Sequence, residues 1–135
     1  MARILLVEDH RALAEMRRTV LTQQGHEVVC AADGKQACQL LNRERFDLVV
    51  TDSELPRASG WVVATAAKKH RLPVILSSGW TLRMTPEQIA TYGVDFVAPK
   101  PCTVAQLLAL IETALTKSKK TSQPSSPPPR FPKVR

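Results

Sequence analysis

The chain has 135 residues, of which 44% are hydrophobic, enough for one domain that buries a core without disulfides or a structural metal. No apolar run approaches the roughly 20 residues of a transmembrane segment, and no signal-peptide pattern opens the chain, so we expect a cytoplasmic protein. The net charge is +7, but six of the 19 basic residues lie from Lys117 onward, where no acid occurs, leaving 13 against 12 acidic residues. A nucleic-acid-binding domain is expected to carry its basic excess on the folded part, whereas here the excess belongs to the last residues.

Five short apolar runs alternate with segments of helical periodicity. Strands are predicted at residues 4–7, 27–31, 48–51, 74–77 and 96–98. Helices are predicted after each strand, and three of them have a capping residue placed three positions before a glutamine, at Asp33, Thr85 and Thr103. This alternation predicts right-handed crossovers and a doubly wound, five-stranded parallel sheet covered by helices on both faces, an α/β fold.

The last residues differ from the rest in composition. The folded domain is predicted to cover residues 1–117, and residues 118–135, rich in Pro, Ser and Lys, are predicted to form a disordered basic tail. Three interpretations of the tail stay open. It could be a solubilising extension, a binding segment for an anionic partner, or a polyproline segment that docks on another protein.

Polar residues follow four of the predicted strands, each at the strand's carboxyl end. They are Glu8, Asp9, Asp52, Ser78, Gly79 and Lys100. The carboxyl ends of parallel strands form one edge of the sheet, where open α/β folds bind their ligands. In a 2-1-3-4-5 strand order the first and third strands are neighbours, so Asp9 and Asp52 are predicted to face each other.

Converging carboxylates need a cation, and oxygen ligands without nearby His or Cys favour Mg²⁺. Lys100 adds a second positive charge, and an ion pair at about 4 Å contributes roughly 4 kcal/mol at an effective dielectric near 20. Ser78 offers a hydroxyl donor. Carboxylates, Mg²⁺, ammonium and hydroxyl together suit a phosphoryl group, with one carboxylate as its nucleophile. Asp9 taken alone is better explained as the cap of the first helix. The metal site is favoured only because Asp52 and Lys100 are predicted at the same edge of the sheet.

The motifs "VEDH", "DLVVTDSELPRASG", "PVILSSG" and "APKP" occur in this order and together resemble a response-regulator receiver domain of two-component signalling. The resemblance extends from residue 3 to about residue 116 and implies a flavodoxin-like (βα)5 fold with strand order 2-1-3-4-5. It implies that Asp52 accepts the phosphoryl group and that Asp9 binds Mg²⁺ directly, with Glu8 acting mainly through water. The backbone carbonyl of Glu54 matches a further metal ligand.

The same resemblance assigns the remaining positions. Ser78 matches the switch hydroxyl, followed by Gly79, and Lys100 the lysine that contacts the phosphoryl oxygens. Pro101 matches a proline after a cis peptide bond. Val97 stands where the family has an aromatic switch residue, so the signal is expected to travel by backbone shifts, with Phe96 on the opposite face of the strand. Glu54 and Trp80 flank the site and predict slow hydrolysis of the phosphorylated form.

Because the predicted tail is too short and too polar to form an output domain, we expect a stand-alone, single-domain response regulator in a phosphorelay. Asp52 would take its phosphoryl group from a histidine kinase or a histidine phosphotransfer protein, and the protein would not be an enzyme beyond its own phosphorylation and dephosphorylation. No intrinsic DNA-binding domain is predicted. An alternative is a receiver-fold binding module that acts through its basic tail independently of phosphorylation. Phosphatases that form an aspartyl-phosphate are disfavoured, because their nucleophile follows the first strand.

Overall fold

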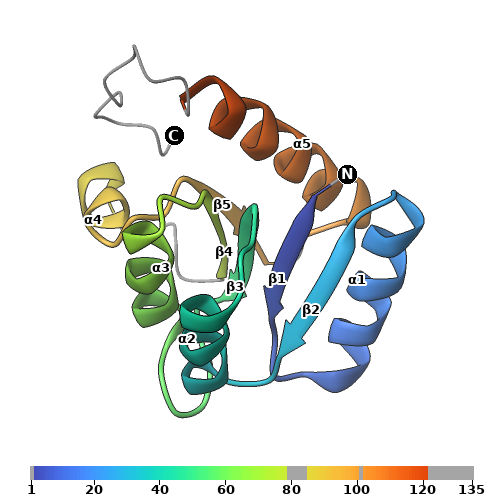
Figure 1. The fold of residues 1–135 in the computed structure, drawn as a ribbon, viewed down its shortest axis with the longest axis horizontal. Coiled ribbons are helices and arrows are strands. Elements are labelled where there is room, and N and C mark those ends of the chain that lie inside the picture. The colour runs from blue at the N-terminus through green and yellow to red at the C-terminus, as the bar shows by residue number, and fades with distance from the viewer. Residues whose placement is uncertain (1, 79–84, 101, 122–135) are drawn as a thin grey trace.

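A computed structural model of the chain describes residues 2–78, 85–100 and 102–121. Strands and helices alternate along the whole of this part (Figure 1). The strands are β1 (Arg3–Val7), β2 (Glu27–Ala31), β3 (Leu48–Asp52), β4 (Val74–Ser78) and β5 (Phe96–Pro99). The helices are α1 (Arg11–Gln23), α2 (Gly34–Arg43), α3 (Gly60–Lys69), α4 (Pro86–Thr91) and α5 (Val104–Thr121).

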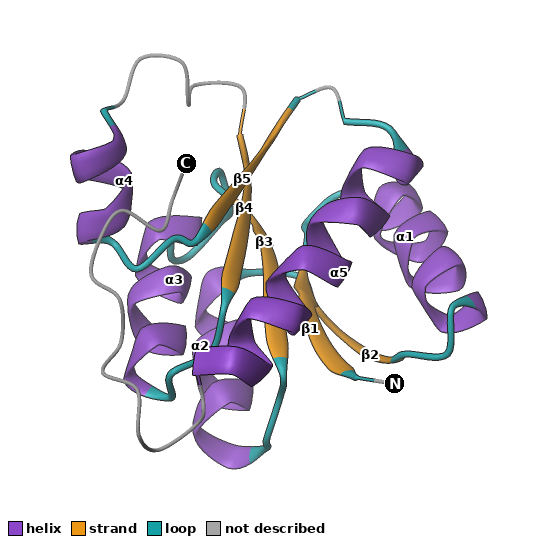
Figure 2. Cartoon of the chain, turned by 90° about the horizontal axis from the view of Figure 1, so that it is seen from above, coloured by secondary structure: helices purple, strands orange, loops and turns teal. Residues whose placement is uncertain are grey.

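The strands form one parallel sheet in the order β2-β1-β3-β4-β5, as predicted. Figure 2 shows α2, α3 and α4 on one side of the sheet and α1 and α5 on the other. The buried side chains accordingly form two apolar clusters, one beneath each helical layer. In β1, Leu5 and Val7 belong to the first cluster and Ile4 and Leu6 to the second, because neighbouring strand residues point to opposite faces. The continuous apolar runs of the central strands are therefore buried on both sides.

Two of the three predicted capping patterns are present at helix starts. Asp33 Oδ1 accepts a hydrogen bond from Gln36 N at 2.7 Å, and Thr103 Oγ1 accepts one from Gln106 N at 3.1 Å. The alternative interpretation, in which Asp9 caps helix α1, is wrong. The cap of this helix is His10, whose Nδ1 accepts from Leu13 N at 3.3 Å, so the Asp9 carboxylate is not committed to that role.

Helix α5 continues to Thr121, beyond the predicted end of the domain at residue 117. The first residues of the predicted tail are therefore helical, and residues 122–135 lie outside the described part of the chain. Within the described ranges, no helix has the length and apolar composition needed to span a membrane.

One hydroxyl in the sheet predicts a stabilising substitution. Ser77 is fully buried in β4, and its Oγ has no hydrogen-bond partner among the described residues. A buried polar group without a partner costs about 1–3 kcal/mol, so Ser77→Ala should raise the free energy of unfolding by about 1 kcal/mol after the lost packing is deducted. Urea unfolding tests this. Ser78→Ala is the matched control, because Ser78, unlike the Ser77 hydroxyl, has an interaction partner. Destabilisation by Ser77→Ala would contradict the prediction.

Candidate functional site

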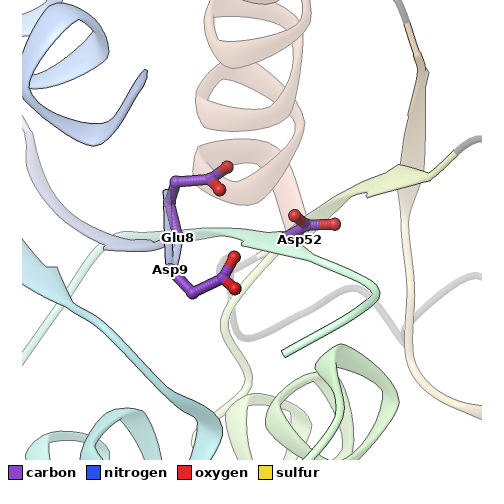
Figure 3. Close-up of side chains that lie close together, drawn as sticks. All are labelled: Glu8, Asp9 and Asp52. Carbon is purple, nitrogen blue, oxygen red and sulfur yellow. The ribbon is translucent and has the colours of Figure 1, made fainter. Parts of the chain in front are cut away.

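Three carboxylates converge at the carboxyl edge of the sheet, between β1 and β3. One carboxylate oxygen from each of three residues, Glu8, Asp9 and Asp52, lies within 4.8 Å of the other two. Glu8 and Asp52 are buried, with 4% and 5% of their surface exposed, whereas Asp9 is exposed. The side chains of Glu8 and Asp9 extend toward Asp52 (Figure 3). The structure thus brings together the three acids predicted from the strand order.

Asp52 ends β3 and is held by groups from two other segments. Lys100, which follows β5, donates from Nζ to Asp52 Oδ1 at 2.8 Å, and Glu54 N donates to the same oxygen at 3.3 Å. The Lys100 N–H also donates to the Ser78 carbonyl at 3.3 Å, which ties the lysine to the end of β4. The predicted ammonium–carboxylate pair is therefore present, with a buried acid and a partly exposed base.

Glu8 lies in the most confined position of the three acids. Its Oε2 accepts a hydrogen bond from His10 N at 3.0 Å. Burial raises the pKa of the Glu8 carboxyl; the His10 N–H lowers it, Asp52 raises it further, and Arg17 and Lys100 lower it. The net effect is a pKa above the ordinary value of 4.5, so Glu8 without a bound metal is harder to ionise than a solvent-exposed glutamate.

The sequence interpretation did not include Arg17. This residue of α1 is buried, and its Nη1 lies 3.7 Å from Glu8 Oε1. A signal was present in the sequence, because Ala14, Arg17 and Leu21 form the buried face of α1 at helical spacing. A basic residue on such a face needs an acid nearby.

The loop after Asp52 is packed against the strand through Gly60. Its N–H donates to the Ser53 carbonyl at 3.0 Å, and a Cβ added at Gly60 would lie 2.0 Å from the Asp52 carbonyl oxygen. Only glycine allows this approach of backbone to backbone. In the middle of the loop, Gly34 N donates to the Pro56 carbonyl at 3.3 Å, so the loop is held at two points.

The remaining predicted site residues are placed as follows. Ser78 is buried at the end of β4, and the side chain of Glu54 is exposed beside Asp52. Val97 packs against the cluster under α2, α3 and α4, while Phe96 belongs to the opposite cluster, which confirms the predicted alternation. Gly79, Trp80 and Pro101 lie outside the described residues.

The raised pKa of Glu8 makes stability depend on pH. Between 4.5 and the raised folded value, the folded protein binds more protons than the unfolded chain, so its stability falls as pH rises through this window. Glu8→Gln should remove this contribution. In metal-free buffer, the stability of the variant relative to the unsubstituted protein should therefore increase from pH 4.5 to pH 8. Urea unfolding at both pH values checks this, and a constant difference would contradict it.

The fold and this edge define a doubly wound α/β domain with an acidic cluster and a lysine on a central aspartate. The sequence matches the response regulator receiver domain family over residues 4–112, and the chain belongs to this family. It is a receiver domain of the two-component response regulators. The transcriptional regulatory protein CpxR of Escherichia coli K12 is 32% identical over 119 residues, which cover 87% of this chain and 51% of CpxR. The chain thus spans about half of this relative.

Solved structures agree with this assignment. The CheY-like receiver domain protein of Methanospirillum hungatei JF-1 superposes with a TM-score of 0.80 at 27% identity, covering 89% of this chain and 98% of that one. The response regulator TrrA of Thermotoga maritima, solved in complex with Mg²⁺ and BeF, has a TM-score of 0.75 at 26% identity. That match covers 85% of this chain and 100% of TrrA.

Proposed function

We propose that this receiver domain accepts a phosphoryl group on Asp52 from a histidine kinase or a histidine phosphotransfer protein. The observation that carries the proposal is the position of Asp52, a buried carboxylate held at 2.8 Å by Lys100 and adjoined by two further acids. An isolated buried carboxylate is costly, and this one ends a strand at the edge where such folds bind ligands.

The acidic cluster fits a hard divalent cation. Its donors are carboxylate oxygens within 4.8 Å of one another, and Glu8 Oε1 is buried without a hydrogen-bond partner among the described residues. We propose that Glu8, Asp9, Asp52 and the Glu54 carbonyl hold Mg²⁺, the ion bound in the TrrA complex. When bound, this ion would offset the negative charge of the incoming phosphoryl oxygens.

The protein's own groups account for the rest of the proposed transfer. A carboxylate oxygen of Asp52 attacks phosphorus, the new P–O bond forms, and the P–N bond to the donor histidine breaks with its electron pair left on the imidazole nitrogen. The Lys100 ammonium would exchange its hydrogen bond to the Asp52 carboxylate for one to a phosphoryl oxygen. The Ser78 hydroxyl would donate to another phosphoryl oxygen. The transfer is driven by position and charge, so outside its own phosphorylation and dephosphorylation we propose no enzymatic activity.

The consequence of phosphorylation would be a shift in the segment from α4 to α5. With Val97 in place of an aromatic residue, we propose that backbone movement at the end of β4 transmits the change. That the protein acts as a single-domain regulator within a phosphorelay stays a prediction. The intact mass of the protein isolated from its own cells would test it.

Mass spectrometry of the intact protein tests the phosphoryl transfer. The full chain is incubated with a small acyl-phosphate donor with and without Mg²⁺, beside Asp52→Asn and a known receiver as positive control. We expect a hydroxylamine-sensitive gain of one phosphoryl group that requires both Mg²⁺ and Asp52. No gain under conditions that label the control receiver would overturn the proposed function.

A further inference from the structure

Arg17 and Glu8 form an ion pair inside the protein, directly beside the acidic cluster. Their side chains are only 8% and 2% exposed, and Arg17 Nη1 lies 3.7 Å from Glu8 Oε1. This distance is longer than a charge-assisted hydrogen bond, and Oε1 has no hydrogen-bond partner among the described residues. The pair is therefore electrostatic, and Oε1 keeps its capacity to accept a ligand.

No other acid within the described ranges pairs with Arg17. Glu8 is the one carboxylate that lies within ion-pair distance of its guanidinium there. A guanidinium on the buried face of α1 is costly to desolvate, and an apolar side chain would suit the neighbouring Ala14 and Leu21 better. Packing alone does not account for an arginine at this position, whereas the charge of Glu8 does.

Two cations thus pair with two different acids of the cluster. Lys100 pairs with Asp52, and Arg17 pairs with Glu8. When all three acids are ionised, the three carboxylates and two cations carry one net negative charge, whereas the acids alone carry three. The attraction of a divalent ion to this edge is therefore weaker than the three acids alone would produce, because Lys100 and Arg17 offset part of their charge.

We propose that Arg17 is a built-in counter-ion that competes with Mg²⁺ for Glu8 and so lowers the metal affinity of the unphosphorylated site. The inference rests on the proposed metal site and adds to it the residue that sets its affinity. Coupling between two ligands of one group is reciprocal, so metal binding also weakens the hold of Arg17 on Glu8. Helix α1, which carries Arg17, thereby senses whether the site is loaded.

Isothermal titration of the full chain with MgCl₂ at pH 8 and constant ionic strength tests this proposal. Arg17→Met removes the charge and keeps an apolar side chain of similar length on the buried face. We expect it to bind Mg²⁺ about three- to tenfold more tightly than the unsubstituted protein. Arg18→Met is the matched control, because Arg18 is the next residue of the same helix but is exposed. Its affinity should stay unchanged.

Thermal unfolding with and without Mg²⁺ gives a second measurement. Without metal, Arg17→Met leaves the Glu8 charge uncompensated and should lower the unfolding temperature. Because tighter binding stabilises the folded state more, Mg²⁺ should raise that temperature further in Arg17→Met than in the unsubstituted protein. Should Arg17→Met not fold, Arg17→Gln is titrated instead, with the same expectations.

The outcomes separate this inference from the proposed function. If the unsubstituted protein binds no Mg²⁺ at millimolar concentration, both the metal site and the inference fail. If it binds Mg²⁺, but the Arg17 variant binds no more tightly than Arg18→Met, the metal site stands and the role of Arg17 is overturned. Tighter binding confined to the Arg17 variant supports the counter-ion.

Discussion

Asp52→Asn is expected to weaken Mg²⁺ binding by at least about tenfold, because it removes a full charge and an oxygen ligand from a buried cluster. Asp52 belongs both to the acidic cluster and to the ion pair with Lys100. Its carboxylate lies near Glu8 and Asp9 and accepts a hydrogen bond from the Lys100 ammonium. The amide cannot offset the charge of Lys100, so the field at the cluster becomes less favourable to any cation. Isothermal titration measures the change.

Asp33→Asn is the matched control for this substitution. Asp33 caps α2 through its side chain, and asparagine caps a helix about as well as aspartate. The control therefore removes one negative charge while leaving the acidic cluster intact, and its Mg²⁺ affinity should stay near that of the unsubstituted protein. Equal affinity in Asp52→Asn and Asp33→Asn would place the metal elsewhere. Asp52→Asn is expected to lower the Mg²⁺ affinity, whereas Arg17→Met is expected to raise it. The two variants therefore test the charge of the site in opposite directions.

Gly60→Ala is expected to lower the free energy of unfolding by about 3 kcal/mol or more, among the largest effects of a single substitution in this protein. The added methyl would lie 2.0 Å from the Asp52 carbonyl oxygen and 2.8 Å from Ser53 Cα. Both neighbours are backbone atoms in or next to a buried strand, so neither can turn aside as a side chain would. Relief requires that α3 or the end of β3 move, which displaces Asp52. Urea unfolding measures the loss of stability.

Gly25→Ala separates this clash from the general cost of replacing a glycine. Gly25 has a φ of +93° and no atom within 4 Å of an added Cβ, so only backbone strain of about 1–2 kcal/mol is expected. If the two variants lose the same stability, the contact of Gly60 with the strand is not what requires glycine. If Gly60→Ala also loses Mg²⁺ binding while Gly25→Ala keeps it, the loop positions the acidic cluster.

The residues that come together at the site were predictable because they follow strands. Parallel strands present all their carboxyl ends at one edge, so Asp9, Asp52 and Lys100 had to meet once the alternation of elements was recognised. The strand boundaries moved by only one residue at several ends, for instance to Asp52 in β3 and Ser78 in β4. These two residues therefore lie in the sheet itself, which explains their burial.

Other features depend on which atoms meet across the fold. Arg17 stands in a helix whose spacing marks it as core-facing, but only the packing of α1 beside β1 gives it the Glu8 carboxylate as a partner. His10 replaced Asp9 as the cap of α1, because a cap depends on the local direction of the chain at the helix start. The length of α5 beyond residue 117 was likewise missed, since charged and polar residues extend a helix without any apolar pattern.

The class of fold, the order of its elements, and the acids and lysine that meet at the carboxyl edge could all be predicted from the sequence. These follow from local periodicity and from the topology that alternating strands and helices must adopt. How the charges are paired could be seen only in the folded structure. Pairing depends on distances between side chains far apart in the chain, such as Lys100 with Asp52 and Arg17 with Glu8, and on how far each is buried. Those distances and that burial set the charge a metal ion meets at this edge.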